Sequence, residues 1–209
     1  MIKFFTTLII VLGVYSATFA QTKNSVEFGA NIGYNVSYVN ETGYADVSSP
    51  AVSGFNFGVS ADIKVSDRWS IKGKLILDQK GWNDGYLIEE DGTTINNINF
   101  QLNYLTIPVT ANWHFGRMKN WYLNFGPYAG FLLSATETSS TTDVKSAFNN
   151  NDFGVSFGIG VKFPVSEKVK LFIEDDQQAG VTNILKTNDG SVVQNIRSSI
   201  NIGIAFPLD

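Results

Sequence analysis

Apolar and polar residues alternate with a period of two along almost the whole chain, and this pattern most constrains the fold. Every second residue from Phe28 to Tyr38 is apolar, and the residues between them are small or polar. The segments 55–65 and 153–165 repeat the pattern. Successive side chains of a β-strand point to opposite faces of the sheet, so the alternation predicts strands with one apolar and one polar face.

The alternation divides into eight predicted strands, which short and long connections join in turn. The predicted strands span 26–39, 53–65, 69–80, 100–115, 121–134, 152–165, 169–180 and 195–207. The short connections are 66–68, 116–120 and 166–168, and the long ones, rich in Ser, Thr, Asn, Asp and Gly, are 40–52, 81–99, 135–151 and 181–194. Such a chain is predicted to be all-β, an eight-stranded antiparallel up-and-down transmembrane β-barrel of the outer membrane.

The first twenty residues are predicted to be a secretory signal peptide. Lys3 supplies a positive charge, residues 4–14 form an apolar stretch, and small residues at Thr18 and Ala20 precede the expected cleavage site. Eleven apolar residues are too few to span a bilayer as a helix. The remaining residues, 21–209, show no domain boundary and are predicted to form one barrel in the cell outer membrane of a Gram-negative bacterium.

Composition excludes several classes of function. The 209 residues include no Cys and one His, and carry a net charge of −4. These counts give no support to a disulfide scaffold, a thiolate or histidine-rich metal site, or a nucleic-acid surface. His114 is predicted to point inward, opposite Tyr122, which does not suit a hydrolase acting at the lipid surface. We therefore expect no enzymatic activity, no catalytic residue, no metal site and no cofactor.

A soluble, lipocalin-like barrel would also alternate, but with its apolar face inward. Two features favour the membrane arrangement. The polar face holds ten glycines, which leave room for long side chains inside a narrow barrel: Gly29, Gly33, Gly54, Gly58, Gly126, Gly130, Gly154, Gly158, Gly160 and Gly203. Aromatic residues such as Trp69, Trp113 and Trp121 gather near the short-turn end, as they do at membrane boundaries.

The same alternation places charges of both signs in the lumen. The predicted lumen charges are Glu27, Asp62, Lys64, Lys72, Lys74, Asp78, Lys162, Lys170, Glu174, Asp176 and Arg197. Asp62 should face Lys72 across the tight turn at 66–68. The strands 69–80 and 169–180 lie opposite each other in a ring of eight, so Lys72 and Lys74 should reach Glu174 and Asp176. We expect a salt-bridge network that closes the lumen; a small polar pore or a proton path is the alternative.

Two segments depart from the alternation. Phe100, Leu102 and Tyr104 occupy even positions, whereas the apolar residues from Leu105 onward occupy odd ones. A β-bulge or a membrane exit near Tyr104 would explain this change. The alternation also directs Asp175 and Gln177 toward lipid, where a carboxylate is unfavourable. A bulge in that strand, a position at the upper edge of the membrane, or a partner-binding role for Asp175 would account for it.

Four segments resemble strands of the PorT-like outer-membrane β-barrel family of Bacteroidota. Residues 104–109 read YLTIPV, 126–133 read GPYAGFLL, 152–160 read DFGVSFGIG and 180–184 read GVTNI. These are similar in content and order to the family motifs YLxIPL, GPYxGxLL, DFGxxxGxG and GLTNI. The resemblance implies an eight-stranded barrel with both termini in the periplasm, and it implies no reaction. Asp176-Gln177 stands where family members often carry Arg-Tyr.

The function that these features favour is a structural or interaction role through the long loops. A pore for small solutes or protons is the second hypothesis, and a barrel enzyme acting on lipids or peptides is the third. The expected partners are outer-membrane lipid and lipopolysaccharide, with a protein or glycan at loops 40–52, 81–99, 135–151 and 181–194. The acids of residues 89–92 are expected at an exposed hairpin tip, with divalent-cation binding as the alternative. We expect a monomer that binds no nucleic acid.

Overall fold

The computed structural model describes residues 25–42, 47–88, 94–186 and 192–208, so the predicted signal peptide and the tip at 89–92 lie outside the described residues. Two short strands, β2 (Val47–Ser48) and β7 (Thr142–Asp143), and one 3-10 turn, η1 (Lys145–Ala147), lie in the long loops. The long strands are β1 (Val26–Thr42), β3 (Val52–Lys64), β4 (Trp69–Ile88), β5 (Thr94–Phe115), β6 (Trp121–Glu137), β8 (Asn151–Ser166), β9 (Val169–Gly180) and β10 (Val192–Leu208).

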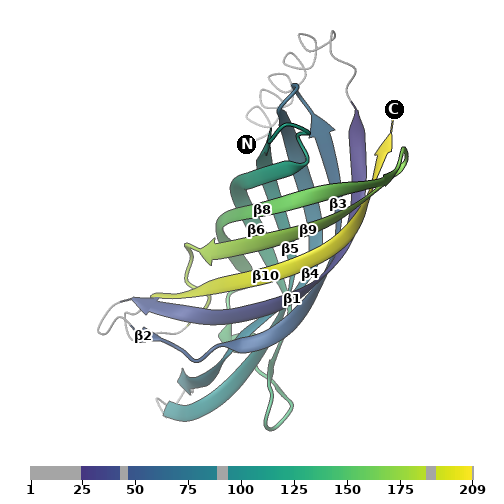
Figure 1. Cartoon of the computed structure of the whole chain (residues 1–209). Helices are drawn as coiled ribbons and strands as arrows, with labels where there is room; N and C mark the ends of the chain where they lie inside the picture. Colours follow the sequence, from purple (N-terminus) through teal and green to yellow (C-terminus); the bar gives the residue numbers. More distant parts are fainter. Residues whose placement is uncertain (1–24, 43–46, 89–93, 187–191, 209) are drawn as a thin grey trace, which may run out of the picture.

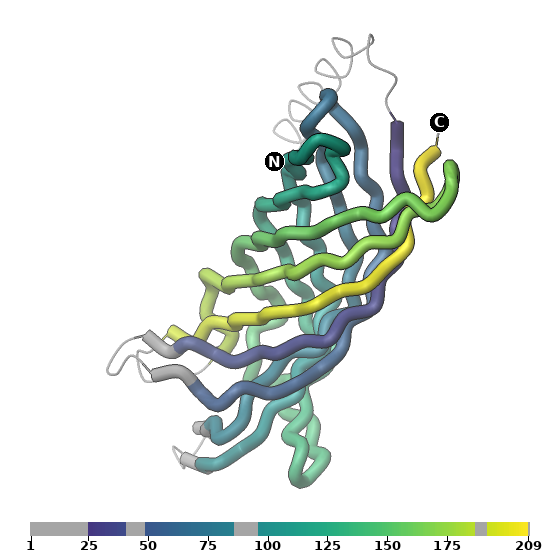
Figure 2. Tube along the Cα trace, in the orientation of Figure 1, coloured from purple at the N-terminus to yellow at the C-terminus, as the bar shows by residue number. Residues whose placement is uncertain are grey.

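The eight long strands form a closed antiparallel ring. Each strand pairs with the next, and β10 pairs with β1 from Val26–Leu208 to Thr42–Val192, so no long strand has a free edge. Figures 1 and 2 show β1 and β10 side by side, with the start of β1 and the end of β10 at the same end of the barrel. The predicted all-β, eight-stranded up-and-down barrel is confirmed.

The apolar face of the barrel points outward. Ile32 and Phe55 are 67% and 69% exposed, whereas Asn35 and Asn112 are fully buried inside. Aromatic rings gather at the short-turn end, where Trp113 stacks on Phe115. The lipocalin-like alternative is wrong, because it requires an apolar interior and a polar exterior. Among the described residues, no helix is long and apolar enough to cross a membrane.

Strands β4 and β5 extend well beyond their predicted ends. The segment 81–99 was predicted to be a loop, but β4 continues to Ile88 and β5 begins at Thr94. Register shifts on both sides of Gly85, together with left-handed backbone at Asp84 and Asn97, interrupt the ladder there. Bulged strands lose strict alternation, and the Gly- and Asn-rich composition resembles that of a loop, which is why the prediction fails.

The irregularity near Tyr104 has a different cause from the one predicted. The β5–β6 register does shift between Asn103 and Tyr104, but the extra residue is Leu133 on β6. β5 therefore keeps its alternation, and Phe100, Leu102 and Tyr104 are all buried inside the barrel. Neither a bulge in β5 nor a membrane exit causes the change from even to odd apolar positions, because the loop end of the lumen is itself apolar.

Asp175 lies on the outer face of β9, and the predicted bulge at this point is absent. Its register with Ile159 of β8 and Ile200 of β10 is continuous. The side-chain amide nitrogen of Gln177 donates a hydrogen bond of 2.8 Å to Asp175, and the Ser198 hydroxyl donates to Gln177. A short hydrogen-bonded chain thus satisfies part of this carboxylate on an otherwise apolar wall.

Replacing the outward-facing carboxylate should stabilise the barrel in a bilayer. We expect Asp175→Leu to raise the free energy of unfolding by about 1 to 2 kcal/mol, because a lipid-facing acid is unfavourable. The measurement is urea unfolding in phospholipid vesicles, followed by tryptophan fluorescence. Lower stability of Asp175→Leu would mean that the position lies in water or contacts a polar partner.

Glycines on the lumen face make room for large side chains from the neighbouring strand. A Cβ at Gly160 would lie 2.3 Å from the Tyr122 ring, and one at Gly154 would lie 2.6 Å from the Tyr128 ring. Gly73, on the outer face, has nothing within 4 Å of such a Cβ. The narrow interior is therefore filled by pairing glycine with tyrosine across neighbouring strands.

The same valine substitution should have opposite effects at these two kinds of glycine. Gly160→Val must displace Tyr122, and we expect it to lower the free energy of unfolding by about 1 to 3 kcal/mol. Gly73→Val meets open space and adds β-propensity, so it should leave the stability unchanged or raise it. Equal destabilisation in the vesicle unfolding assay would contradict the packing described here.

Candidate functional site in the barrel lumen

Ion pairs lie at successive levels along the lumen. The first level is at the short-turn end. Lys162 on β8 contacts both Glu27 on β1 and Asp62 on β3, the latter at 3.2 Å. Lys170 on β9 approaches Glu27 at 2.6 Å. Asp62 also accepts a hydrogen bond of 3.3 Å from Asn112. Four strands are thus joined by charged side chains at this level.

The second level connects opposite walls of the barrel. Lys72 on β4 lies 2.9 Å from Glu174 on β9, and Lys74 contacts both Glu174 and Asp176, the latter at 3.1 Å. Tyr122 donates a hydrogen bond of 2.8 Å to Glu174. These are the cross-lumen contacts that the ring geometry predicts. Asp62 and Lys72 are register partners, as expected, although no ion pair joins them in the described structure.

The third level is centred on Arg197 of β10. Its guanidinium lies 2.9 Å from Asp176 and 3.2 Å from Asp78. Asp78 on β4 also accepts hydrogen bonds from Asn35 at 2.9 Å and from Thr106 at 3.3 Å. Because Asp176 also contacts Lys74, the second and third levels form one continuous network.

A fourth level, absent from the predicted set, pairs Lys80 of β4 with Asp152 of β8. Their charged atoms are 3.1 Å apart and both side chains are fully buried. Asn195 donates a hydrogen bond of 3.0 Å to Asp152, and the Lys80 ammonium lies 4.7 Å from the centre of the Tyr128 ring. Lys80 continues the even-numbered series of lumen residues on its strand, so the alternation could have predicted that its side chain points inward. The pair was not predicted because Lys80 is the last residue of one predicted strand and Asp152 is the first residue of another.

The paired charges in the lumen balance. Six cations and six anions take part in these contacts: Lys72, Lys74, Lys80, Lys162, Lys170 and Arg197 with Glu27, Asp62, Asp78, Asp152, Glu174 and Asp176. Charges removed from water need partners of opposite sign, and an equal number of each sign supplies them. Ten of the eleven predicted lumen charges belong to this set.

Lys64, the eleventh, lies outside the network. It is exposed at the end of β3 and takes part in no ion pair among the described residues. It lines a cavity of about 310 Å³ that lies at the short-turn end and is also lined by Glu27, Lys162 and His114. β3 ends at Lys64, so the alternation of the strand no longer directs this side chain into the ion-pair network.

His114 points into this cavity and contacts Ser70. The Ser70 hydroxyl is 3.0 Å from Nε2 of His114, and His114 is the register partner of Tyr122, as predicted. Ser70 itself is buried. Throughout the described part of the chain, no group of three His, Cys, Asp or Glu side chains is placed to hold a metal ion.

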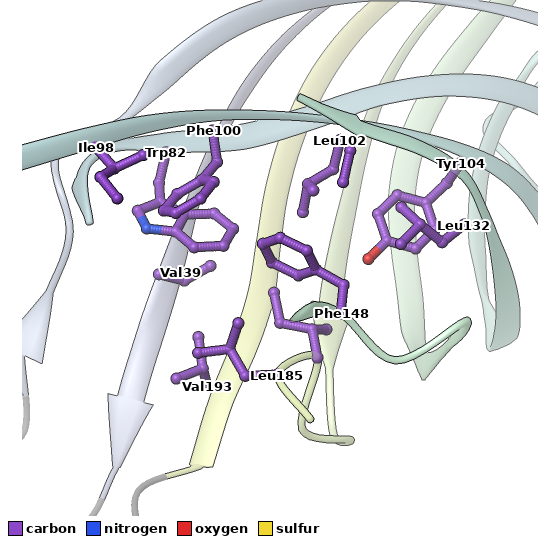
Figure 3. Close-up of a cluster of buried hydrophobic side chains, with 12 residues drawn as sticks. Val39, Trp82, Ile98, Phe100, Leu102, Tyr104, Leu132, Phe148, Leu185 and Val193 are labelled. Carbon is purple, nitrogen blue, oxygen red and sulfur yellow. The ribbon is translucent and has the colours of Figure 1, made fainter. Parts of the chain in front are cut away.

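Between the ion pairs and the loop end, which is at the bottom of Figure 1, an apolar cluster fills the lumen (Figure 3). Trp82, Phe100 and Phe148 form its centre, with ring centroids 4.6 to 5.9 Å apart. We call this cluster the apolar cap. Its buried members are Val39, Trp82, Ile98, Phe100, Leu102, Tyr104, Leu132, Ala135, Phe148, Ile184, Leu185 and Val193.

Two long loops supply part of the apolar cap. Phe148 follows η1, Ile184 and Leu185 follow β9, and Phe148 forms an isolated β-bridge with Leu185. The backbone N–H of Asn149 donates to the carbonyl of Ile184 at 2.8 Å, and that of Lys186 donates to Ala147 at 3.0 Å. Parts of the predicted loops 135–151 and 181–194 therefore fold inward together over the barrel.

The fully buried pair predicts a clear stability result. Lys80→Met leaves Asp152 charged and unpaired, and we expect it to lower the free energy of unfolding by about 3 to 5 kcal/mol. The double variant Lys80→Met/Asp152→Leu should recover most of this loss, because neither charge then remains. Lys119→Met, which breaks only the exposed pair with Asp67, should have little effect. If the double variant is less stable than Lys80→Met, the pair is not the cause.

An apolar exterior, a closed ring of eight strands and a polar interior together define an integral outer-membrane β-barrel protein. The family model described as "Outer membrane protein beta-barrel domain" matches residues 19–186, which is most of the chain. The chain belongs to this family, and it is located in the outer membrane. No curated protein matches the chain.

Several solved structures are similar to this chain in fold. They include Ail of Yersinia pestis in complex with the heparin analogue sucrose octasulfate, at 14% identity, covering 88% of this chain and 99% of that one, with a TM-score of 0.46. OprG of Pseudomonas aeruginosa has 9% identity, coverage of 88% and 97%, and a TM-score of 0.49. Neisserial surface protein A has 12% identity, coverage of 85% and 96%, and a TM-score of 0.46.

Proposed function

We propose that this protein is a closed barrel that conducts neither solutes nor ions and has a structural or interaction role. The observation that carries the proposal is the contact of Lys72 and Lys74 with Glu174 across the centre of the lumen. A solute would have to separate these charges in a space that excludes bulk water, and that separation is costly.

The apolar cap adds a second barrier to passage. Phe148 and Ile184 are fully buried above the ion pairs, so a solute entering from the loop end would have to displace them. Because the ion pairs and the apolar cap block the lumen above the cavity at the short-turn end, we assign function to the outer wall and the exposed parts of the long loops. We propose a PorT-like barrel whose loops contact a protein or glycan, and which is a monomer in the membrane.

The proposed role includes no catalysis. Ser70 and His114 are within hydrogen-bond distance and both line the cavity at the short-turn end, but among the described residues no carboxylate hydrogen-bonds the His114 ring to orient it as a base. The hydrogen bond is better suited to completing the polar lining of the cavity at the short-turn end.

A small polar pore or proton path is the second candidate, and one observation favours it. Gln178 and Ser156 are register partners inside the barrel, and neither side chain has a hydrogen-bond partner among the described residues. Polar groups of this kind are usually satisfied by buried water. A water site between the Arg197 and Lys80 levels would supply one element of a proton path.

Conductance in a planar lipid bilayer separates the two candidates. The closed-barrel proposal predicts no current steps for the wild type. Lys74→Ala removes the cation that contacts Glu174 and Asp176, so it should introduce small current steps. Lys119→Ala changes a lysine of the β5–β6 turn that pairs only with Asp67 and takes no part in the cross-lumen network, so this variant should remain silent. Steps in the wild type that persist unchanged in Lys74→Ala would refute the closed-barrel proposal.

A further inference from the structure

A groove of about 600 Å³ runs across the outer wall on β1, β3 and β4, and Phe206 of β10 and Ile107 of β5 border it. Its walls are apolar side chains, and its floor is formed by small residues and strand backbone. The residues that shape it are Phe28, Val59, Ala61, Gly73, Leu75 and Phe206. This groove is independent of the lumen and of the proposed closed state.

Register explains why the wall is hollow here. Ala61 pairs with Gly73 on one side and with Phe28 on the other, so two of the smallest residues lie side by side beneath large neighbours. The β4–β5 ladder is also interrupted between Gly73–Val109 and Ile76–Thr106. Pro108 lies in this gap and has no N–H to donate. The result is an open depression between large side chains of the neighbouring strands.

Positive charge lies at the end of the same hairpin. Arg68 in the β3–β4 turn is exposed and takes part in no ion pair among the described residues. The adjacent Asp67 is bonded to Lys119, which lowers the pKa of the Asp67 carboxyl. Asp67 is therefore already neutralised from the neighbouring turn, which leaves Arg68 as a basic rim below the groove.

The spacing between groove and rim matches an amphipathic ligand. Gly73 lies on β4 and Arg68 immediately precedes this strand, five residues away, which is roughly 16 Å along an extended chain. Trp69 lies between them on the outer face and is partly exposed, as expected for a ring at headgroup depth. Short turns of outer-membrane barrels face the periplasm, so this end meets the periplasmic leaflet.

We propose that the groove binds one acyl chain of a glycerophospholipid of the periplasmic leaflet, with the lipid phosphate held at Arg68. The apolar walls accept the hydrocarbon chain and the basic rim accepts the anionic phosphate. A guanidinium suits a phosphate because it donates two parallel hydrogen bonds. The barrel thereby selects a particular lipid at this position instead of exchanging it freely with the bilayer.

The test is native mass spectrometry of the full barrel in detergent with added phosphatidylglycerol. Wild type should retain one lipid more tightly than the rest. Gly73→Phe fills the groove and should abolish this retention, whereas Ala179→Phe adds the same ring to the outer wall at β9, on the opposite side of the barrel, and should preserve it. The unheated gel mobility of each variant shows whether it has folded.

The headgroup half of the site is tested with a second probe. Arg68→Gln should weaken phosphatidylglycerol retention about tenfold, the effect of losing a charged hydrogen bond, but should not change retention of diacylglycerol. Equal lipid retention by wild type and Gly73→Phe would overturn the proposal. A dimer that Gly73→Phe disrupts would also overturn it, because the occupant would then be a second copy of the chain.

Discussion

The ion pairs that cross the lumen at Glu174 are the interaction on which the rest of the structure depends. An eight-stranded barrel is narrow enough for a lysine on one wall to reach a carboxylate on the opposite wall. Lys72, Lys74, Tyr122 and Asn124 all contact the Glu174 side chain, so this buried anion is well compensated. The lumen glycines follow from this arrangement, because the large side chains need space.

The interior changes character along the barrel axis. Paired charges occupy the lower and middle lumen, and the apolar cap occupies the loop end, with Lys80 and Asp152 at the junction. The two regions exclude water by different means: the first satisfies its charges internally, and the second removes hydrocarbon from water. This division explains why the loops after β6 and β9 turn inward. Their apolar residues Phe148, Ile184 and Leu185 complete a core inside the barrel.

Much of this architecture could be predicted from the residue pattern. The alternation and the lengths of the connections were sufficient to predict a ring of eight strands. The geometry of that ring was sufficient to predict that Lys74 approaches Glu174. The apolar cap could not be found in this way, because Phe100 and Leu102 read as lipid-facing when every apolar residue is assigned to the outside. The Lys80–Asp152 ion pair was not predicted, because both residues lie at the ends of predicted strands. The groove forms because the small residues Ala61 and Gly73 are register partners on neighbouring strands. The sequence of one strand alone does not show which residue of the next strand lies beside it.

The most direct measurement of the central claim is solid-state NMR of the barrel in lipid bilayers. Dipolar couplings between lysine ¹⁵Nζ and side-chain ¹³C carboxyl nuclei report the pairs themselves. We predict that Lys74 couples to both Glu174 and Asp176, and that Lys72 couples to Glu174. Lysine nitrogens that show contacts with mobile water and none with these carboxyl groups would contradict the account, because the lumen would then be hydrated and open.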